Sequence, residues 1–376
     1  MAVAETRICR KARTYLARSV FSLQPGVMPR PLPDILRIDW PRGAGPPSAV
    51  TLAALDRAAE LLRQGRLVAI PTETVYGLAA NALDPDAVAR IFQAKGRPAG
   101  NPLIVHVADE QQARSLAAAW PPAAARLAAA VWPGPATVVV PRSTQIPGIV
   151  TAEGPTVALR CPAHPVSRLL IERAGIPLAA PSANRSESVS PTTAQHVLAS
   201  LGNRIDLILD AGGCERGIES TVVDCTTTPP RILRPGPLSR AELEVALGEA
   251  VDWPSSSDPA GLPAIERSPG QGRRHYAPKT PLELPAHPAA RVEELLASGR
   301  RVGWLMLGAD ERARALATSR ELVAVPMPPD PMAYARQLYA TLHALDHRHL
   351  DRIVVDPPPA TENWAAILDR LTRAAS

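Results

Sequence analysis

Apolar residues along the chain alternate between helical and extended spacing. From Leu52 to Leu62 they recur every three or four residues until Gly65, a pattern typical of an amphipathic helix. The apolar run at residues 67–70 then predicts a buried strand. The same reasoning predicts helices at residues 88–94, 113–131 (broken at 121–122), 166–174 and 192–201, and strands at 103–107, 138–140, 157–159, 178–180, 207–209 and 222–223. This alternation predicts an α/β domain.

A composition change separates this domain from a second one. Ser239 and Glu242 are spaced as a capping box and predict a last helix that ends at Leu247. Residues 251–281 are rich in Pro, Ser and Gly and continue neither periodicity, so we expect a linker. A smaller α/β unit is predicted for residues 282–376, with helices near 292–296, 334–345 and 364–371 and strands at 302–307 and 353–355.

The net charge of +5 lies in the first 47 residues, which hold eight basic and three acidic side chains. Residues 48–376 hold 33 of each sign, so the folded part has no general attraction to a phosphate backbone. The first 27 residues are Arg-rich and lack a long apolar stretch, unlike a secretory signal. We expect residues 1–47 to be a disordered tail, a targeting segment or an over-extended start, and the first domain to span 48–250.

The cysteines and the apolar runs indicate in which cellular compartment the protein is expected. The four cysteines are scattered singly, without the spacing of metal ligands, so we expect free thiols and no metal site in the protein. No apolar run approaches the roughly 18 residues of a membrane helix. We therefore expect a soluble, cytoplasmic protein without a membrane partner.

Lysine is rare here, with three residues against 38 arginines, which suggests a use for a compact point charge at those positions. Lys95 and Arg97 follow a predicted helix, and two cations at a helix C-terminus are commonly just a solvated end. The turn at residues 98–102, however, leads into a predicted strand and places both cations beside a sheet edge, where ligands usually bind. Both interpretations remain open on this segment alone.

Two polar turns also follow predicted strands, at residues 71–78 and 180–184. Their hydroxyls and carboxylate could face a pocket, or simply satisfy their own backbone. Ser190 and Pro191 suggest a helix start whose N–H groups could hold a phosphate, or a plain capped helix. The sequence contains no P-loop, no dinucleotide-binding glycine motif and no nucleophile elbow.

Together these clusters resemble one family, the two-domain L-threonylcarbamoyladenylate synthases with a YrdC-type catalytic domain. The resemblance covers residues of about 50 to 376. The matching segments stand in the family's order at residues 71–78, 95–106, 132–135, 180–184, 190–192, 217–221, 234–237 and 275–278. It implies a YrdC-like twisted open mixed sheet with flanking helices, plus a smaller Rossmann-like α/β C-terminal domain.

The resemblance also implies an activity. Such a nucleotidyltransferase makes L-threonylcarbamoyl-AMP from L-threonine, bicarbonate or CO2, and ATP, and releases pyrophosphate. The product serves threonylcarbamoyladenosine modification of tRNA that reads codons starting with A, so the implied partner is a downstream threonylcarbamoyl transferase machinery, with weak RNA binding also expected. Mg2+ is expected with ATP rather than as a structural metal, because phosphates and water supply most of its ligands.

Site residues follow from the resemblance position by position. The catalytic set falls on Lys95, Arg97, Ser182 and Asn184. The L-threonine side falls on Thr74, His106, Arg160, the backbone of Ala180, and Ser220. The ATP side falls on Arg97, Asn101, Thr156, Ser182, Ser190, Arg234 and Tyr276, and Tyr276 of the linker is expected to cover the nucleotide. Residues 271–273 and 362–364 depart from the family pattern. A site of cations and hydroxyls suits a reaction that crowds anions together and needs no protein nucleophile.

Two other functions fit part of the pattern. A non-catalytic RNA-binding protein could use the same basic cleft, but the neutral sum over residues 48–376 and the 3% aromatic content argue against it. A carbamoyltransferase acting on carbamoyl-adenylate through a similar domain would be expected to carry acyl-phosphatase and zinc-binding modules, which the sequence does not show.

Overall fold

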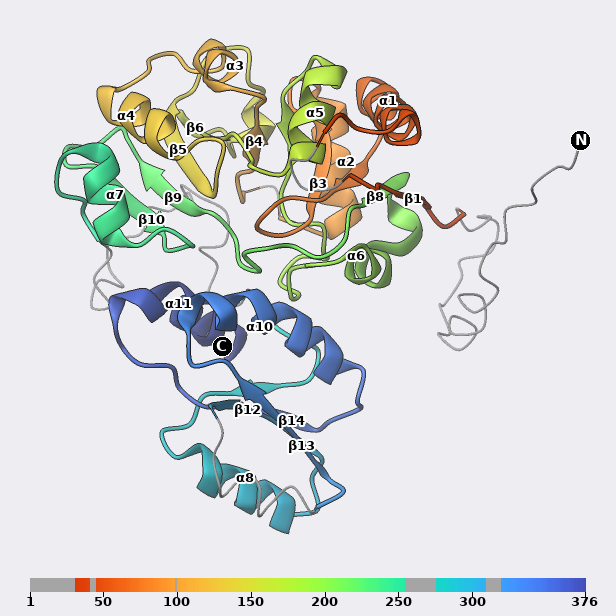
Figure 1. Ribbon diagram of the computed structural model, residues 1–376, viewed down its shortest axis with the longest axis vertical. Coiled ribbons are helices and arrows are strands. Elements are labelled where there is room, and N and C mark those ends of the chain that lie inside the picture. The colour runs from red at the N-terminus through yellow and green to blue at the C-terminus, as the bar shows by residue number, and fades with distance from the viewer. Residues whose placement is uncertain (1–30, 41–44, 99, 254–274, 309–318) are drawn as a thin grey trace, which may run out of the picture. The chain divides into compact units, whose positions relative to one another are not determined.

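The computed structural model describes residues 31–40, 45–98, 100–253, 275–308 and 319–376, and within them the chain forms two sheets with flanking helices (Figure 1). The larger sheet contains β1 (Asp34–Arg37), β2 (Val68–Ile70), β3 (Gly77–Asn81), β4 (Ile104–His106), β5 (Ala136–Pro141), β6 (Thr156–Arg160), β7 (Leu178–Ala179), β8 (Leu207–Asp210), β9 (Thr221–Asp224) and β10 (Arg231–Arg234). Its helices are α1 (Ala49–Arg63), α2 (Pro85–Lys95), α3 (Glu110–Ser115), α4 (Pro122–Val131), α5 (Pro165–Ala174), α6 (Ala194–Leu201) and α7 (Arg240–Leu247).

The ten strands lie in the order β1-β8-β2-β3-β7-β4-β6-β5-β9-β10. Pairs such as β4 with β6 are parallel, whereas β3 pairs antiparallel with both β2 and β7. The sheet is therefore mixed and open, as expected. Successive residues of β2 point to opposite faces: Val68 and Ile70 pack with α1 and α5, and Ala69 packs in the core that contains α2, α4, α6 and α7.

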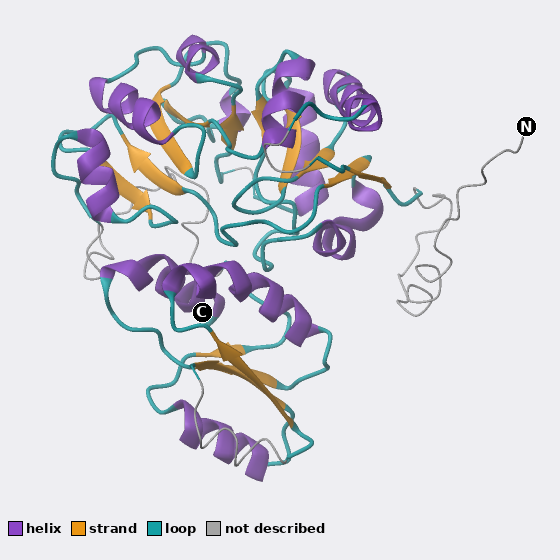
Figure 2. Cartoon of the chain, viewed as in Figure 1, coloured by secondary structure: helices purple, strands orange, loops and turns teal. Residues whose placement is uncertain are grey.

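The smaller sheet has the order β11-β14-β12-β13 and is parallel throughout. Its elements are β11 (Leu282–Glu283), α8 (Pro288–Ala297), β12 (Val302–Leu307), β13 (Leu322–Met327), α10 (Pro331–Asp346), β14 (Arg352–Val355) and α11 (Ala365–Ala374). Figure 2 shows α8 on one face of this sheet and α10 and α11 on the other, and each face has its own apolar core. The expected smaller α/β domain is thus present.

Local capping fixes where α2 ends, and with it the position of Lys95. The Asp84 side chain accepts hydrogen bonds from the backbone N–H groups of Asp86 and Ala87 and starts the helix. Gly96 has a φ of 62°, a left-handed conformation that glycine adopts without strain, and it stops the helix immediately after Lys95. The chain therefore turns there and carries Arg97 in a different direction.

Three expectations need correction. Residues 1–47 do not all lie outside the fold, because Asp34–Arg37 pairs in parallel with β8; residues 1–30 and 41–44 lie outside the described residues. The helix expected from Thr192 begins at Ala194, capped by Thr193, and Ser190 is not its cap. Strands β1, β3, β10, β11 and β13 were not predicted.

Most of the expected linker lies in 254–274, outside the described residues. In the part of the chain that the structure describes, no helix is long and apolar enough to cross a membrane.

Candidate active site

A narrow pocket lies where the turn between β2 and β3 meets the segments around β4, β6, β7 and β9. Its cavity volume is about 40 Å³, close to the space of a single water molecule. The lining residues are Thr72, Thr74, Val75, Gly77, Arg97, Ile104, His106, Arg160, Ala180, Pro181, Ser182, Glu219, Ser220, Arg234, His275 and Tyr276. Nine of the predicted site residues are in this set, although they come from segments up to 202 positions apart.

Lys95 stands beside this pocket and is only 2% exposed. Its Nζ donates hydrogen bonds to the backbone carbonyls of Ser182, at 2.5 Å, and Asn184, at 2.6 Å. The predicted catalytic set is therefore brought together around one amine. Burial, and then the charge of Arg97, lowers the pKa of Lys95 well below its ordinary value, against a smaller opposing effect of Glu219. An anion placed here would act in the opposite direction and raise this pKa.

Arg97 lines the pocket and connects it to Asn101. Its guanidinium donates to the side-chain oxygen of Asn101 and, at 3.0 Å, to the carbonyl of Pro102. Asn101 does not itself line the pocket. Thr156 lies at the opposite end of β6 from Arg160, roughly 13 Å away at about 3.3 Å per strand residue. The structure therefore does not bring Thr156 into this pocket.

The threonine side contains a buried ion pair that sequence reasoning missed. Arg160 donates to Oε1 of Glu73 at 2.7 Å, and both side chains are almost fully buried. Burial acts to raise the pKa of Glu73, but the charge and hydrogen bond of Arg160 outweigh it and the pKa lies below its usual range. His106 lies nearby, and burial together with Arg160 lowers the pKa of its imidazole to about 3. The His106 imidazole is therefore neutral at physiological pH.

Ser220 and Arg234 form a second group on the pocket wall. The Ser220 hydroxyl lies 2.8 Å from the hydroxyl of Thr137, and Arg234 donates to the Ser220 carbonyl at 3.0 Å and to its hydroxyl at 3.2 Å. All three residues are buried. Arg234 is thus oriented by the segment that precedes β9 and directs its cation at the pocket.

Glu219 is the second buried carboxylate that sequence reasoning missed. Its Oε1 accepts a hydrogen bond from the hydroxyl of Ser190 at 2.6 Å. Burial acts to raise the pKa of Glu219, but the charges of Arg370 and Arg234 and the hydrogen bond from Ser190 together lower it. Ser190 does not line the pocket directly, yet this contact joins it to the pocket wall.

His275 and Tyr276 close the pocket from the segment after the first domain. Tyr276 is 1% exposed, and its φ of 59° is an uncommon conformation for a residue with a side chain. Within the described part of the chain, its hydroxyl and the Nδ1 atoms of His275 and His106 are buried without a hydrogen-bond partner. Buried polar atoms of this kind are rare and are expected where a ligand supplies the partner.

Comparison with known proteins decides the family. Residues 60–236 match a family model described as telomere recombination, and residues 238–376 match one described as the threonylcarbamoyl-AMP synthase C-terminal domain. The chain is 41% identical to a threonylcarbamoyl-AMP synthase from Pyrococcus abyssi (strain GE5 / Orsay), over 85% of this chain and 93% of that protein. The chain belongs to the threonylcarbamoyl-AMP synthase family. A Bacillus subtilis (strain 168) member is 40% identical over 85% of this chain and 92% of its own length.

Solved structures agree with this family assignment. The crystal structure of P. abyssi Sua5 complexed with L-threonine has a TM-score of 0.78 and 37% identity, covering 91% of this chain and 97% of that one. A P. abyssi Sua5 variant with a consecutive histidine and tyrosine both replaced by alanine has a TM-score of 0.79 and 36% identity, covering 91% and 96%. The expected fold and the expected enzyme class, a threonylcarbamoyl-AMP synthase, are confirmed, and a non-catalytic RNA-binding protein is not supported.

The sequence gives a stronger signal for the buried ion pair of Glu73 than for that of Glu219. Glu73 is the single acid in the turn at residues 71–78, directly after a buried strand, and a lone charge in that position suggests a buried partner. Glu219 lies in the matched segment 217–221, but no pattern in the sequence indicates that its partners come from the other domain. The sequence predicted Glu73 as a carboxylate that could face a pocket but did not predict its ion pair with Arg160, and it did not indicate Glu219.

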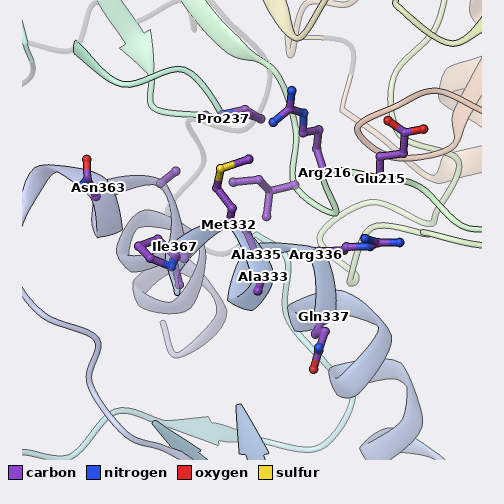
Figure 3. Close-up of a pocket in the computed structure, with 14 residues that line it drawn as sticks. Glu215, Arg216, Pro237, Met332, Ala333, Ala335, Arg336, Gln337, Asn363 and Ile367 are labelled. Carbon is purple, nitrogen blue, oxygen red and sulfur yellow. The ribbon is translucent and has the colours of Figure 1, made fainter. Parts of the chain in front are cut away.

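A larger cavity of about 610 Å³ lies on the other side of the segment that carries Glu219. Figure 3 shows Glu215, Arg216 and Pro237 from the first domain facing Met332 and Arg336 of α10. None of the predicted site residues lines it. The cavity lies between the two domains and is separate from the narrow pocket described above.

Proposed function

We propose that the narrow pocket is where the enzyme condenses L-threonine, CO2 or bicarbonate, and ATP. The threonine amine attacks the carbon of CO2, an N–C bond forms, and the nitrogen loses a proton to give a carbamate. Bicarbonate supplies the same carbon with loss of water. A carbamate oxygen then attacks the α-phosphorus of ATP, and the bond to the β-phosphate oxygen breaks with release of pyrophosphate. No protein nucleophile takes part.

On the threonine side, we assign Arg160 to the amino-acid carboxylate. The Glu73 pair fixes the orientation of that guanidinium, and neutral His106 can hydrogen-bond to the substrate without adding charge. Thr74 and Ser220 offer hydroxyls, and the backbone at Ala180 offers a further polar contact. The P. abyssi Sua5 crystal structure is a complex with L-threonine, and its similarity to this chain supports the same substrate here.

On the ATP side, we assign Lys95, Arg97 and Arg234 to the phosphates, with Ser182, Ser190 and Asn101 as polar contacts. The pocket needs to neutralise the carbamate and the triphosphate together, and buried cations do this more strongly than exposed ones. Burial and Arg97 lower the pKa of Lys95, and the negative charge of a phosphate would act in the opposite direction. Thr156 lies outside the pocket, so its assignment requires ATP to extend beyond it.

Mg2+ fits this site as an ion carried by ATP. The pocket offers hydroxyls and carbonyls, whereas Glu73 and Glu219 are each engaged in ion pairs. Among the described residues, no group of three His, Cys, Asp or Glu side chains could hold a metal. The ATP phosphates and water would supply most ligands, and the ion would neutralise charge on the leaving pyrophosphate.

The single observation that carries the proposal is the convergence of Lys95, Arg97, Arg160 and Arg234 with buried hydroxyls around one pocket. Tyr276 is buried and lines that pocket, and covering the nucleotide there would protect a labile mixed anhydride from water. The product would then pass in the cytoplasm to a threonylcarbamoyl transferase that acts on tRNA.

Pyrophosphate release tests the proposal directly. It should require ATP, L-threonine and bicarbonate together, because the attacking oxygen exists only after the amine has taken up carbon. Mass spectrometry of the same reactions should detect threonylcarbamoyl-AMP. Equal release of pyrophosphate without L-threonine, or without bicarbonate in degassed buffer, would contradict the assigned reaction.

A further inference from the structure

The C-terminal domain contacts only part of the pocket, and the hydrogen bonds of Ser220 and Arg160 show which part it leaves out. Ser220 and Arg160, on the threonine side, have the hydrogen-bond partners Thr137, Arg234, Glu73 and the carbonyl of Gly134, all from the first domain. Each of these partners precedes residue 251. The threonine side is therefore assembled by the catalytic domain itself.

On the ATP side, in contrast, Ser190 and Tyr276 are contacted by the C-terminal domain, whereas Lys95, Arg97 and Arg234 have hydrogen-bond partners in the first domain. The carbonyl of Ser190 accepts a hydrogen bond from Nε2 of His343 on α10 at 3.1 Å. The hydroxyl of Ser190 donates to Oε1 of Glu219, and Glu219 is in turn bound by two residues of the C-terminal domain. Both polar groups of Ser190 thus depend, directly or through one carboxylate, on that domain.

Tyr339 and Arg370 converge on the second oxygen of Glu219. The Tyr339 hydroxyl donates to Oε2 at 3.0 Å, and Nε of Arg370 donates to the same atom at 3.1 Å. Tyr339 and Arg370 are 0% and 1% exposed, so these bonds form in a water-poor environment where they hold Glu219 firmly. Removing either donor would leave the buried negative charge of Glu219 only partly compensated.

The same two residues enclose the ring of Tyr276. The rings of Tyr276 and Tyr339 are stacked with centroids 5.9 Å apart, and Cζ of Arg370 lies 5.2 Å from the Tyr276 centroid. Arg370 also donates to the carbonyl of Pro235 at 2.8 Å, next to Arg234. Ser190, Tyr276 and the backbone beside Arg234 are therefore all contacted by one small cluster of the C-terminal domain.

We propose that Tyr339 and Arg370 are positioning residues that set ATP affinity and leave L-threonine affinity unchanged. This inference rests on the proposed function, which assigns Ser190, Arg234 and Tyr276 to ATP. It gives the C-terminal domain a defined part in the reaction: it holds Glu219 and the Tyr276 ring so that the nucleotide side of the pocket is formed before ATP arrives.

The test uses the full chain with three variants and one control. Tyr339→Phe removes only the hydroxyl and keeps the ring that stacks on Tyr276, so it should fold. Arg370→Ala removes the cation, and Arg370→Lys restores part of it. Arg336→Gln is the matched control, because Arg336 is exposed on α10 and does not contact Glu219.

Calorimetric titration with a non-hydrolysable ATP analogue and, separately, with L-threonine gives the readout. We expect ATP binding to weaken at least fivefold in Tyr339→Phe and further in Arg370→Ala, with partial recovery in Arg370→Lys. L-threonine binding should stay within twofold of the wild type in every folded variant, and Arg336→Gln should match the wild type for both ligands.

The inference is overturned if folded Tyr339→Phe and Arg370→Lys bind the ATP analogue as the wild type does, or if they lose both ligands to the same extent. The second result would indicate a general structural role. Pyrophosphate release by the wild type, measured in parallel, reports on the proposed function separately, since it can fail while the difference between ATP and L-threonine binding persists.

Discussion

At the residue scale, the burial of the Lys95 side chain determines what its amine can do. It is a nearly fully buried amine between two backbone carbonyls, and its pKa is lowered by burial and by Arg97. A cation with little solvent around it interacts strongly with any anion that approaches. Because Lys95 is buried, it is not a solvated helix end, and its replacement separates the predicted catalytic role from a purely structural one.

Lys95→Ala should lower the rate of pyrophosphate release at least tenfold, equivalent to about 1.4 kcal/mol of transition-state stabilisation. Arg97→Ala should have a similar effect. Lys95→Arg should also be impaired, because a guanidinium is too large for the space between the two carbonyls. Lys279→Ala, at an exposed lysine, is the control. Wild-type kinetics in all Lys95 and Arg97 variants would mean that these buried side chains have only a structural role.

Two buried histidines predict how stability depends on pH. Burial, and for His106 also Arg160, lowers the pKa of His106 and of His275 to about 3 in the folded protein, against about 6.5 in the unfolded chain. Between these values the unfolded state binds protons that the folded state excludes. The free energy of unfolding should therefore fall as the pH drops below 6.5, by about 1.4 kcal/mol per pH unit for each histidine.

Urea denaturation between pH 7.5 and 5 measures this slope, in a window where carboxylates contribute little. His106→Gln should reduce the slope by the share of one histidine. An identical slope in His106→Gln and the wild type would show that His106 takes up a proton in the folded protein as easily as in the unfolded one.

At the scale of elements, the sequence predicted the helices well because periodicity and caps act locally. The capping box of Ser239 and Glu242 is present at the start of α7. Strands were harder where the signal is weak: β3 reads Gly-Leu-Ala-Ala-Asn without β-branched residues, and β1 lies in a basic segment. Strand β13 contains Pro326, which is tolerated because this strand is at a sheet edge.

Replacing Gly217 by alanine should lower the stability of the protein, partly through a clash with the neighbouring domain. Gly217 has a φ of 77°, and a Cβ atom there would lie 2.5 Å from the carbonyl oxygen of Ala335 on α10. Gly175 has a similar φ of 67° but nothing within 4 Å of the same position. Both replacements by alanine should cost about 1–2 kcal/mol for the left-handed backbone, and only Gly217→Ala should add a clash.

Chemical denaturation should accordingly show a clearly larger loss of stability for Gly217→Ala than for Gly175→Ala. Since Glu219 lies two residues away, Gly217→Ala should also weaken ATP binding. Equal stability losses in the two variants would indicate that the contact between this segment and α10 is absent in solution.

At the scale of the whole molecule, the candidate site could be predicted from motifs, but the role of the second domain could not. The resemblance supplied residues from Thr74 to Tyr276, and nine of them line one pocket. The contacts of Arg370 and Tyr339 with Glu219 join positions more than 100 residues apart, and no local pattern encodes such a pairing. Thr156 is the reverse case: the motif match predicted it as a site residue, but it does not line this pocket.

Tyr276 is buried against the C-terminal domain, but its conformation there has two unfavourable features. Its ring is enclosed by Tyr339 and Arg370, yet its backbone is left-handed and its hydroxyl lacks a hydrogen-bond partner among the described residues. The pocket beneath it holds about 40 Å³, too little for a nucleotide. We therefore expect this segment to move when ATP binds, and the apolar and cation–π contacts of the ring to favour its return.

Tyr276→Ala should weaken ATP binding and shorten the lifetime of threonylcarbamoyl-AMP on the enzyme, because water reaches the mixed anhydride. Tyr276→Phe is the matched comparison: it keeps the ring contacts and loses only the hydroxyl, so it should weaken ATP binding less than Tyr276→Ala does and keep the intermediate protected. Nucleotide affinity and the rate of intermediate hydrolysis, measured on both full-length variants, check this. If Tyr276→Ala retains wild-type ATP affinity and intermediate lifetime, the segment is a tether between domains. If Tyr276→Phe fails as badly as Tyr276→Ala, the hydroxyl itself contacts the substrate, and its missing partner in the closed pocket is the ligand.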